Sequence, residues 1–258
     1  MTKQILKNVY NLLPAFIKQW INIIRRQLPA FIKQWINIIL KQLKNYKILS
    51  CYYGQYTTIK EWSCLDAEGK PICWYTYPAL EYLDHMNFAS LKVFEFGSGN
   101  SSLWWLNKAK SVVSIEDDQE WYKKISGQVK KSASLKFRYI LADDKNKYIT
   151  SFDETHADIV IVDGKHRKEC SEHLVSLQKN GKWEGCMLIF DNSDWYPETV
   201  SMLRQSLGWV QADFHGFGPI NNYTWTTTMF LNPENYHNLS YDRHLNSVAG
   251  TGYNAEKP

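Results

Sequence analysis

Short apolar stretches alternate with helical patterns along most of this 258-residue chain, and that alternation constrains the fold more than any other feature. The expected strands span residues 92–96, 111–115, 137–141, 158–162, 186–190, 209–214 and 225–231. The expected helices span residues 102–109, 118–130, 167–179 and 197–206. This pattern predicts an α/β fold with a parallel sheet covered by helices on both faces. The last two strands are joined by a loop without a helix, so we expect them to pair antiparallel.

The stretch FEFGSGNSS, residues 94–102, places a glycine turn between the first strand and a helix. Ligands of open α/β sheets bind beyond the carboxyl ends of the strands, and a helix N-terminus after such a turn can hold one. Gly97 and Gly99 alone are a weak signal that also fits a dinucleotide. Glu95, at the strand end, favours a cationic ligand, because its carboxylate would repel a pyrophosphate. S-adenosylmethionine carries a sulfonium and an ammonium group and no phosphate.

Acidic residues also follow the next two strands. Glu116 can accept hydrogen bonds from ribose hydroxyls, and Asp143 can accept one from an adenine amino group. With EFGSGNS, SIEDD and LADD at these strand ends, the chain resembles the class I S-adenosylmethionine-dependent methyltransferases. The resemblance implies a Rossmann-like sheet of seven strands, the last antiparallel. It also implies a cofactor site made of Glu95, Gly97, Ser98, Gly99, Asn100, Ser101, Glu116, Asp117, Asp143 and Asp163.

Oxygen-bearing side chains follow the fourth and fifth strands. Asp163, Asp191 and Asn192 would meet where adjacent parallel strands end, and Mg²⁺ prefers such oxygen ligands. A bound ion could hold two neighbouring substrate hydroxyls and make one of them easier to deprotonate. His166 lies three residues after Asp163, and imidazole is a suitable base near neutral pH.

This layout resembles the metal-dependent O-methyltransferases of the catechol type, which carry a lysine three residues after the first aspartate. It is also similar to macrolide-sugar O-methyltransferases, in which a histidine of this loop serves as base. Here the position is His166, with Lys165 beside it, so the sugar type is the closer comparison. His215, in the glycine-rich loop between the last two strands, is a rival base. Asp-Asn and Asp-Gly pairs also form ordinary turns, so a purely structural role for them stays open.

The leading hypothesis is an O-methyltransferase that uses S-adenosylmethionine and bound Mg²⁺ to methylate a hydroxyl of a small molecule or a sugar. One alternative keeps the cofactor without the metal and methylates a lipid or a protein at a membrane surface. A third, from another class, is a non-catalytic, membrane-attached adaptor that retains only the fold. Intact Glu95, Gly97, Gly99 and Glu116 favour an enzyme, since an adaptor needs no such set.

Residues 1–48 form a basic extension ahead of the main domain, 49–258. The segment LPAFIKQWINII occurs twice, at 13–24 and 28–39, and each copy predicts an amphipathic helix with proline near its first turn. A basic helix with Trp, Phe and Ile on its other face suits an anionic membrane surface. The alternative is that the helices pack on the main domain or on a second subunit, as in a homodimer.

Charge and cysteine content bear on partners and location. The first 60 residues contain ten Lys or Arg and no Asp or Glu, whereas the remainder has a net charge of −6. A nucleic-acid-binding protein more often spreads basic residues over its fold, so no nucleic-acid partner is expected. Neither repeat copy reaches the roughly 18–20 apolar residues of a transmembrane helix. The five cysteines form no CxxC pair and no zinc spacing. We therefore expect a cytoplasmic protein, peripheral at a membrane.

Overall fold

The computed structural model describes residues 28–129, 134–154, 156–241 and 247–251. Contacts between Cα atoms divide the chain into two units, Met1–Ile48 and Leu49–Pro258. The first copy of the repeat, residues 13–24, lies outside the described residues. Along those that are described, none of the helices combines the length and the apolar character needed to span a bilayer.

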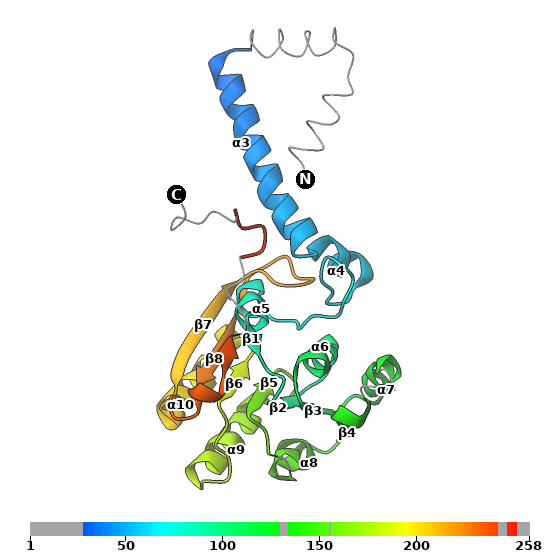
Figure 1. Ribbon diagram of the computed structural model, residues 1–258, viewed down its shortest axis with the longest axis vertical. Coiled ribbons are helices and arrows are strands. Elements are labelled where there is room, and N and C mark those ends of the chain that lie inside the picture. The colour runs from blue at the N-terminus through cyan, green and yellow to red at the C-terminus, as the bar shows by residue number, and fades with distance from the viewer. Residues whose placement is uncertain (1–27, 130–133, 155, 242–246, 252–258) are drawn as a thin grey trace. The chain divides into compact units, whose positions relative to one another are not determined.

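The second copy of the repeat forms helix α3, Ala30–Lys47, which begins directly after Pro29 (Figure 1). None of its residues is buried. At about 100° per residue, Phe31, Trp35 and Leu43 share one side of the helix, and these side chains are 62%, 63% and 56% exposed. Lys41 lies on the opposite side. A π-helical turn, Ile48–Tyr52, follows α3.

The second unit is an α/β structure. Its longer helices are α4 (Gln55–Glu61), α5 (Tyr77–Asp84), α6 (Asn100–Lys108), α7 (Gln119–Gln128), α8 (Lys145–Thr150), α9 (Arg167–Lys179) and α10 (Pro197–Leu207). Short 3₁₀ turns are η2 (Ser134–Lys136), η3 (Ser151–Glu154), η4 (Ser193–Trp195) and η5 (Tyr236–Asn238). Its strands are β1 (Met86–Asn87), β2 (Lys92–Phe96), β3 (Ser111–Glu116), β4 (Phe137–Leu141), β5 (Ile159–Val162), β6 (Met187–Phe190), β7 (Val210–Gly216), β8 (Trp225–Leu231) and β9 (Ser240–Tyr241).

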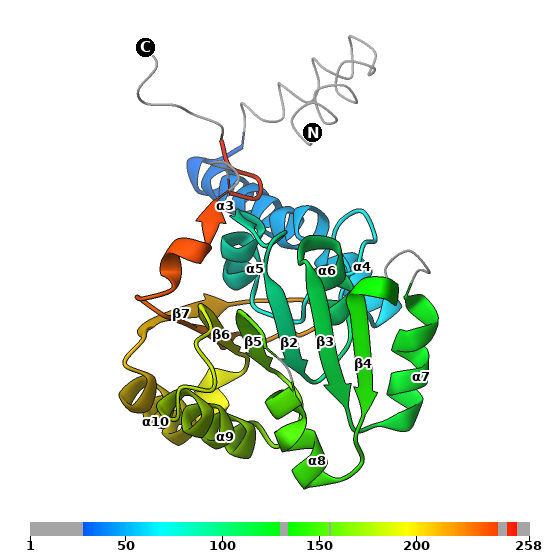
Figure 2. The ribbon, with the colours of Figure 1, turned by 60° about the horizontal axis from the view of Figure 1, so that its bottom comes forward.

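Seven of these strands form one sheet in the order β4-β3-β2-β5-β6-β8-β7, and β1 pairs with β9 in a separate ribbon. The strands from β4 to β6 in this order are parallel, as Figure 2 shows for β2, β3 and β4. Strand β8 inserts between β6 and β7 and is antiparallel to both. This order confirms the predicted Rossmann-like class I methyltransferase sheet, including its antiparallel last strand.

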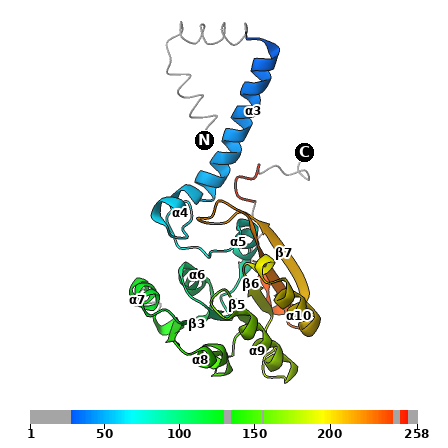
Figure 3. The same cartoon turned by 180° about the vertical axis from the view of Figure 1, so that it is seen from behind.

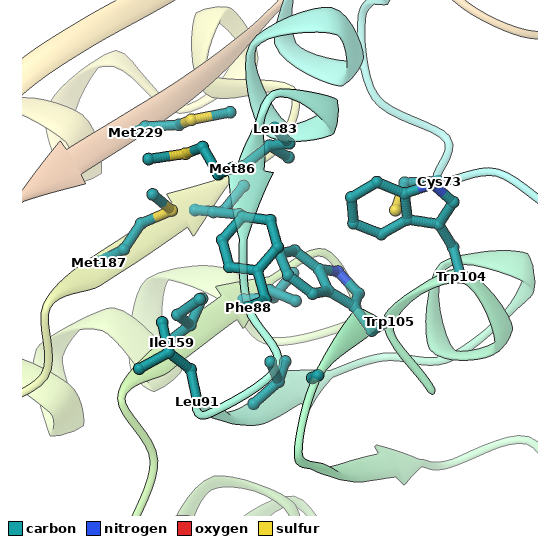
Figure 4. Packing of buried hydrophobic residues seen from close by; sticks show 14 of the residues in the cluster. Cys73, Leu83, Met86, Phe88, Leu91, Trp104, Trp105, Ile159, Met187 and Met229 are labelled. Atoms are coloured by element: carbon teal, nitrogen blue, oxygen red, sulfur yellow. The ribbon is translucent and has the colours of Figure 1, made fainter. Parts of the chain in front are cut away.

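Side chains of each central strand point alternately to two buried layers. One layer contains Ile159 and Ile161 of β5 and packs against α5 and α6; Figure 4 shows Trp105 of α6 there, beside Phe88. The other layer contains Val160 and Val162 and packs against α8, α9 and α10, of which α9 and α10 lie side by side in Figure 3. Because both faces are covered, these strands read as continuous apolar runs rather than alternating ones.

The parallel register brings several chemically active segments to one edge of the sheet. Glu95 lies beside Ser114 on β3 and Ile161 on β5, so the turn after β2 is flanked by the ends of both neighbours. Strand β6 runs parallel to β5 with Phe190 beside Val162, which places the loops after these two strands next to each other. The sheet thus positions the glycine turn and the acidic loops together.

Candidate active site

The glycine turn after β2 adopts a backbone conformation that few side chains tolerate. Gly97 has φ +103°, in the left-handed region, and its amide donates to the carbonyl of Ile115 over 3.0 Å. Gly99 precedes the first turn of α6, and its amide donates to the hydroxyl of Ser102 over 3.2 Å. The turn therefore has a fixed shape and leaves the N-terminus of α6 available for a ligand.

Glu95 lies beneath this turn rather than in contact with a ligand site. It is 1% exposed and accepts hydrogen bonds from the hydroxyls of Ser101, Ser102 and Ser114. Burial raises the pKa of Glu95 to about 7, against the opposing effect of the three hydroxyl donors. The carboxylate predicted as a cofactor ligand thus holds the start of α6 in place from the inside.

The acidic end of β3 is bonded to the glycine turn. Glu116 accepts a hydrogen bond of 2.6 Å from the hydroxyl of Ser98, and its other oxygen accepts the amides of Asp117 and Asp118. Burial raises the pKa of Glu116. The indole nitrogen of Trp121 donates to the carbonyl of Ser98 over 2.9 Å, which places an aromatic ring beside the turn. The end of β3 and the turn therefore form one surface, with exposed Asp143 at the end of the neighbouring strand β4.

A cavity of about 410 Å³ opens beside the turn. It is lined by Trp62, Ser63, Cys64, Trp74, Ser98, Gly99, Asn100, Ser101, Trp121, Lys124, Asp163, Arg167, Asp191, Asn192, Trp195, Ile220, Asn221 and Tyr223. Seven of the predicted site residues are in this set, from two regions distant in the sequence: 98–101, and the loops after β5 and β6. The cavity therefore connects the glycine turn with the predicted metal ligands.

The three predicted metal ligands do meet, and they meet around Arg167. Its Nη2 donates to Oδ1 of Asp163 over 3.0 Å, and its Nη1 donates to Oδ1 of Asn192 over 2.9 Å. Nη1 also donates to the main-chain carbonyl of Asp191 over 2.5 Å. The cation between these loops is thus a guanidinium. Among the described residues, no three His, Cys, Asp or Glu side chains are grouped so that they could hold a metal ion.

The side-chain oxygens of these three residues do not fit the predicted Mg²⁺ site, because they already accept hydrogen bonds from Arg167 and from residues of β8. Asp191, which is 2% exposed, accepts at Oδ1 from the indole of Trp225 over 3.1 Å and from the hydroxyl of Thr227 over 2.5 Å. One oxygen of Asp163 and the amide oxygen of Asn192 are bonded to the guanidinium. The prediction that these three residues converge is correct, whereas their assignment as metal ligands has no support in the structure.

The carboxyl groups of partly buried Asp163 and buried Asp191 lie close enough to influence each other here. Burial raises the pKa of Asp163 to about 6, although the guanidinium of Arg167 opposes the shift. The pKa of Asp191 is raised well above its usual range, first by burial and then by the charge of Asp163. Among the described residues, no hydrogen bond engages the Oδ2 atom of either side chain. The Oδ2 atom of Asp163, whose pKa is raised to about 6, is therefore available to accept a proton near neutral pH.

The residues predicted as bases lie outside the cavity lining. His166 has φ 54°, precedes α9 and packs edge-on against the ring of Tyr148, with 5.9 Å between ring centroids. Lys165 is exposed and pairs with Asp117 over 2.5 Å. His215 belongs to β7 and not to the following loop, and its Nδ1 lies 2.7 Å from the hydroxyl of Thr226.

Sequence reasoning missed much of the cavity wall. Arg167, Trp121 and Trp195 were not singled out from the sequence, and all three line the cavity. Trp74 and Tyr223 had a weak signal, since both lie in aromatic-rich loops next to strands of the sheet. The segment Trp62–Cys64 had none; Asn100 holds it by donating to the hydroxyl of Ser63 and the carbonyl of Cys64.

No family model matches the chain, and no curated protein matches it. Among solved structures, it is similar to a precorrin-6y C5,15-methyltransferase from Geobacter metallireducens GS-15, at 12% identity and a TM-score of 0.46, over 59% of this chain and 87% of that one. It is similar to TrmK of M. capricolum in complex with S-adenosylhomocysteine, at 13% identity and a TM-score of 0.44, over 67% and 73% of the two chains. It is also similar to an rRNA methylase from Streptococcus thermophilus, at 15% identity and a TM-score of 0.41, over 60% and 96%. These likenesses are distant, and their names do not decide between a small-molecule and a nucleic-acid acceptor.

Proposed function

We propose that this chain is an S-adenosylmethionine-dependent methyltransferase that acts on a hydroxyl of a small molecule or a sugar. The observation that carries the proposal is the cavity of about 410 Å³, whose lining includes both the glycine turn and the side chains of Asp163 and Asp191. An enzyme of this class needs a donor site and a base at one acceptor pocket.

The residues around the turn fit S-adenosylmethionine, which supplies an electrophilic methyl group when bound. Ser98 and Gly99 line the cavity, and the amides at the start of α6 suit the carboxylate of the donor's methionine part. Glu116 ends β3 and Asp143 follows the neighbouring strand β4, and these two side chains would serve the ribose and the adenine. Glu95 acts beneath them, because it ties Ser101 and Ser102 in the first turn of α6 to Ser114 on β3.

The pair Asp163 and Asp191 is the proposed base, in place of Lys165, His166 and His215. Both carboxyl groups line the cavity, and the pKa of Asp163 is raised to about 6, near the range in which a base works best at neutral pH. An ionised carboxylate there can accept the proton of an acceptor hydroxyl as its oxygen attacks the methyl group. No step of this scheme requires Mg²⁺.

Aromatic side chains at the cavity favour a ring-shaped acceptor. Trp62, Trp74 and Trp195 are 72%, 42% and 57% exposed, and they offer flat apolar faces on which a sugar or an aromatic ring can stack. The cavity volume lies within the range typical of small-molecule sites. A small cyclic acceptor therefore suits this wall better than an extended chain.

The exposed face of α3 supports attachment to an anionic membrane surface. Its apolar side chains are more than half exposed at Phe31, Trp35 and Leu43, while the first 60 residues carry ten positive and no negative side chains. An amphipathic helix within such a basic segment suits the interface of an anionic bilayer. We place the proposed enzyme at such a surface, which does not alter its acceptor class.

Calorimetric titration of S-adenosylmethionine into the purified chain tests the first half of the proposal, and we expect micromolar binding. Transfer of a labelled methyl group is then measured on three pools: hydroxylated small molecules and sugars, RNA, and lipids. Asp163→Asn and Asp191→Asn should lower transfer at least 100-fold, and His166→Gln should change it less than threefold. Absence of donor binding overturns the methyltransferase assignment. Transfer to RNA or lipid alone overturns the small-molecule acceptor.

A further inference from the structure

We propose that the guanidinium of Arg167 replaces a divalent cation, so that this chain carries as a side chain the positive charge that Asp163, Asp191 and Asn192 would otherwise draw from a metal. The binding part of this inference stands on geometry alone. Its consequence, a methyltransferase indifferent to divalent ions, rests on the proposed function.

The guanidinium lies among the oxygens that a metal would use. Asp163 and Asn192 each accept a hydrogen bond from it through a side-chain oxygen, at 3.0 and 2.9 Å, and Asp191 accepts through its main-chain carbonyl. The Arg167 side chain is 13% exposed, and its central carbon lies 5.7 Å from the centre of the Tyr196 ring. A protein ring therefore packs near the charge, which is largely withdrawn from water.

Arg167 has no N–H left for a substrate. A guanidinium has five N–H donors, and Arg167 directs them to five acceptors. Nε donates to the carbonyl of Gly164; Nη1 donates to the carbonyl of Asp191 and to Oδ1 of Asn192; Nη2 donates to the carbonyl and to Oδ1 of Asp163. Arg167 is consequently a positioning residue: it joins the loops after β5 and β6 and supplies a fixed charge beside two carboxyl groups.

This arrangement works against a metal in two ways. A divalent ion at the same oxygens would face a buried positive charge at close range, which is strongly unfavourable in a poorly solvated site. It would also have to break hydrogen bonds to an ionised donor, which are the stronger kind. Arg167 begins α9 four residues after Asp163, so its position is set by the helix start and it cannot easily move aside.

Removing the guanidinium should therefore create a metal site. The full-length chain is titrated with Mn²⁺, and bound ion is measured by electron paramagnetic resonance. The wild type should bind no Mn²⁺ at this cluster up to about 1 mM. Arg167→Ala should bind one Mn²⁺ at least tenfold more tightly than the wild type, because the carboxylate of Asp163, the amide oxygen of Asn192 and the carbonyl of Asp191 are left without their cation. Arg167→Lys, which keeps a positive charge, is the matched control and should stay unresponsive.

Adding Asp163→Asn to Arg167→Ala should abolish the new Mn²⁺ binding and so locate it. A folded Arg167→Ala chain that binds no Mn²⁺ would overturn the inference. If Arg167→Ala unfolds, the unfolding temperature of the wild type with and without 10 mM Mg²⁺ still tests the inference. We expect Mg²⁺ to leave that temperature unchanged. A rise that Asp163→Asn removes would overturn the inference. None of these readings needs donor or turnover, so failure of donor binding alone would refute only the proposed function.

Discussion

A Cβ atom on Gly97 would lie 2.8 Å from the backbone nitrogen of Gly164, so the turns after β2 and β5 touch backbone to backbone. The amide of Asp163 also donates to the carbonyl of Phe96 over 3.0 Å. The turn that we assign to the methyl donor and the loop that carries the proposed base are therefore held as one rigid piece.

Gly97→Ala should destabilise the chain by roughly 2–4 kcal/mol, because an alanine would be strained at φ +103° and its Cβ would meet the backbone of Gly164. Urea unfolding followed by circular dichroism measures the loss. Gly127→Ala, in α7 with no atom within 4 Å of the added Cβ, is the matched control and should stabilise the chain slightly. Equal stability of Gly97→Ala and the wild type would contradict the backbone contact described above.

The rate of methyl transfer should rise with pH through about 6 and then level off. Burial raises the pKa of Asp163 to about 6, and the proposed base accepts a proton only when ionised. The pH dependence of kcat/KM measures this rise, and the apparent pKa obtained from it belongs to the Asp163–Asp191 pair. Asp163→Asn should abolish most of the activity and also the rise of the rate with pH. If the residual activity of that variant still rose through the same pH range, the base would be another residue.

Glu95 should make the fold less stable as the pH rises from about 4.5 to about 7. Its pKa is raised from 4.5 to about 7 in the folded chain, so the folded state binds the proton more tightly, and stability is lost over this window as the group ionises. Glu95→Gln should therefore show a smaller fall in unfolding temperature between pH 5 and pH 8 than the wild type. Some fall should remain, since burial also raises the pKa of Asp163 and of Asp191. Glu120→Gln, on exposed α7, is the control and should retain the full wild-type dependence.

Trp35→Ser combined with Leu43→Ser should weaken binding of the full chain to phosphatidylserine vesicles at least tenfold, because both side chains belong to the exposed apolar side of α3. Co-sedimentation with vesicles at two salt concentrations measures the effect. Gln34→Ser combined with Asn37→Ser, on the polar side, is the matched control. If the wild type ignores vesicles and instead dimerises through this face, the membrane proposal is wrong.

The sheet was readable from the sequence because its strands are buried on both faces and appear as unbroken apolar runs. The bounds of β2, β4 and β8 agree with the expected ranges residue for residue. Elements that depend on distant partners were less accessible. Strand β7 continues to Gly216 because pairing with Trp225 on β8 extends the ladder, which moved His215 from the expected loop into the strand.

The candidate site was readable in part for a related reason. Convergence of Asp163, Asp191 and Asn192 follows from the adjacency of β5 and β6, which the strand pattern implies. Their shared partner Arg167 could not be predicted, because its contact with these residues depends on the direction in which α9 begins. His166, just before it, has a left-handed backbone that no local motif signals.

Residues of β8, which comes much later in the chain, donate hydrogen bonds that hold the loop after β6. Trp225 and Thr227 donate to Asp191, and the amide of Thr226 donates to Asp194 over 2.9 Å. On the ribosome, a nascent chain that has emerged only through α10 has the acidic loop without any of these donors. Every other strand of the large sheet has been synthesised before β8 inserts and completes the pocket. The hydrogen bonds that hold the loop after β6 can therefore form only late in the synthesis of the chain, once β8 has emerged.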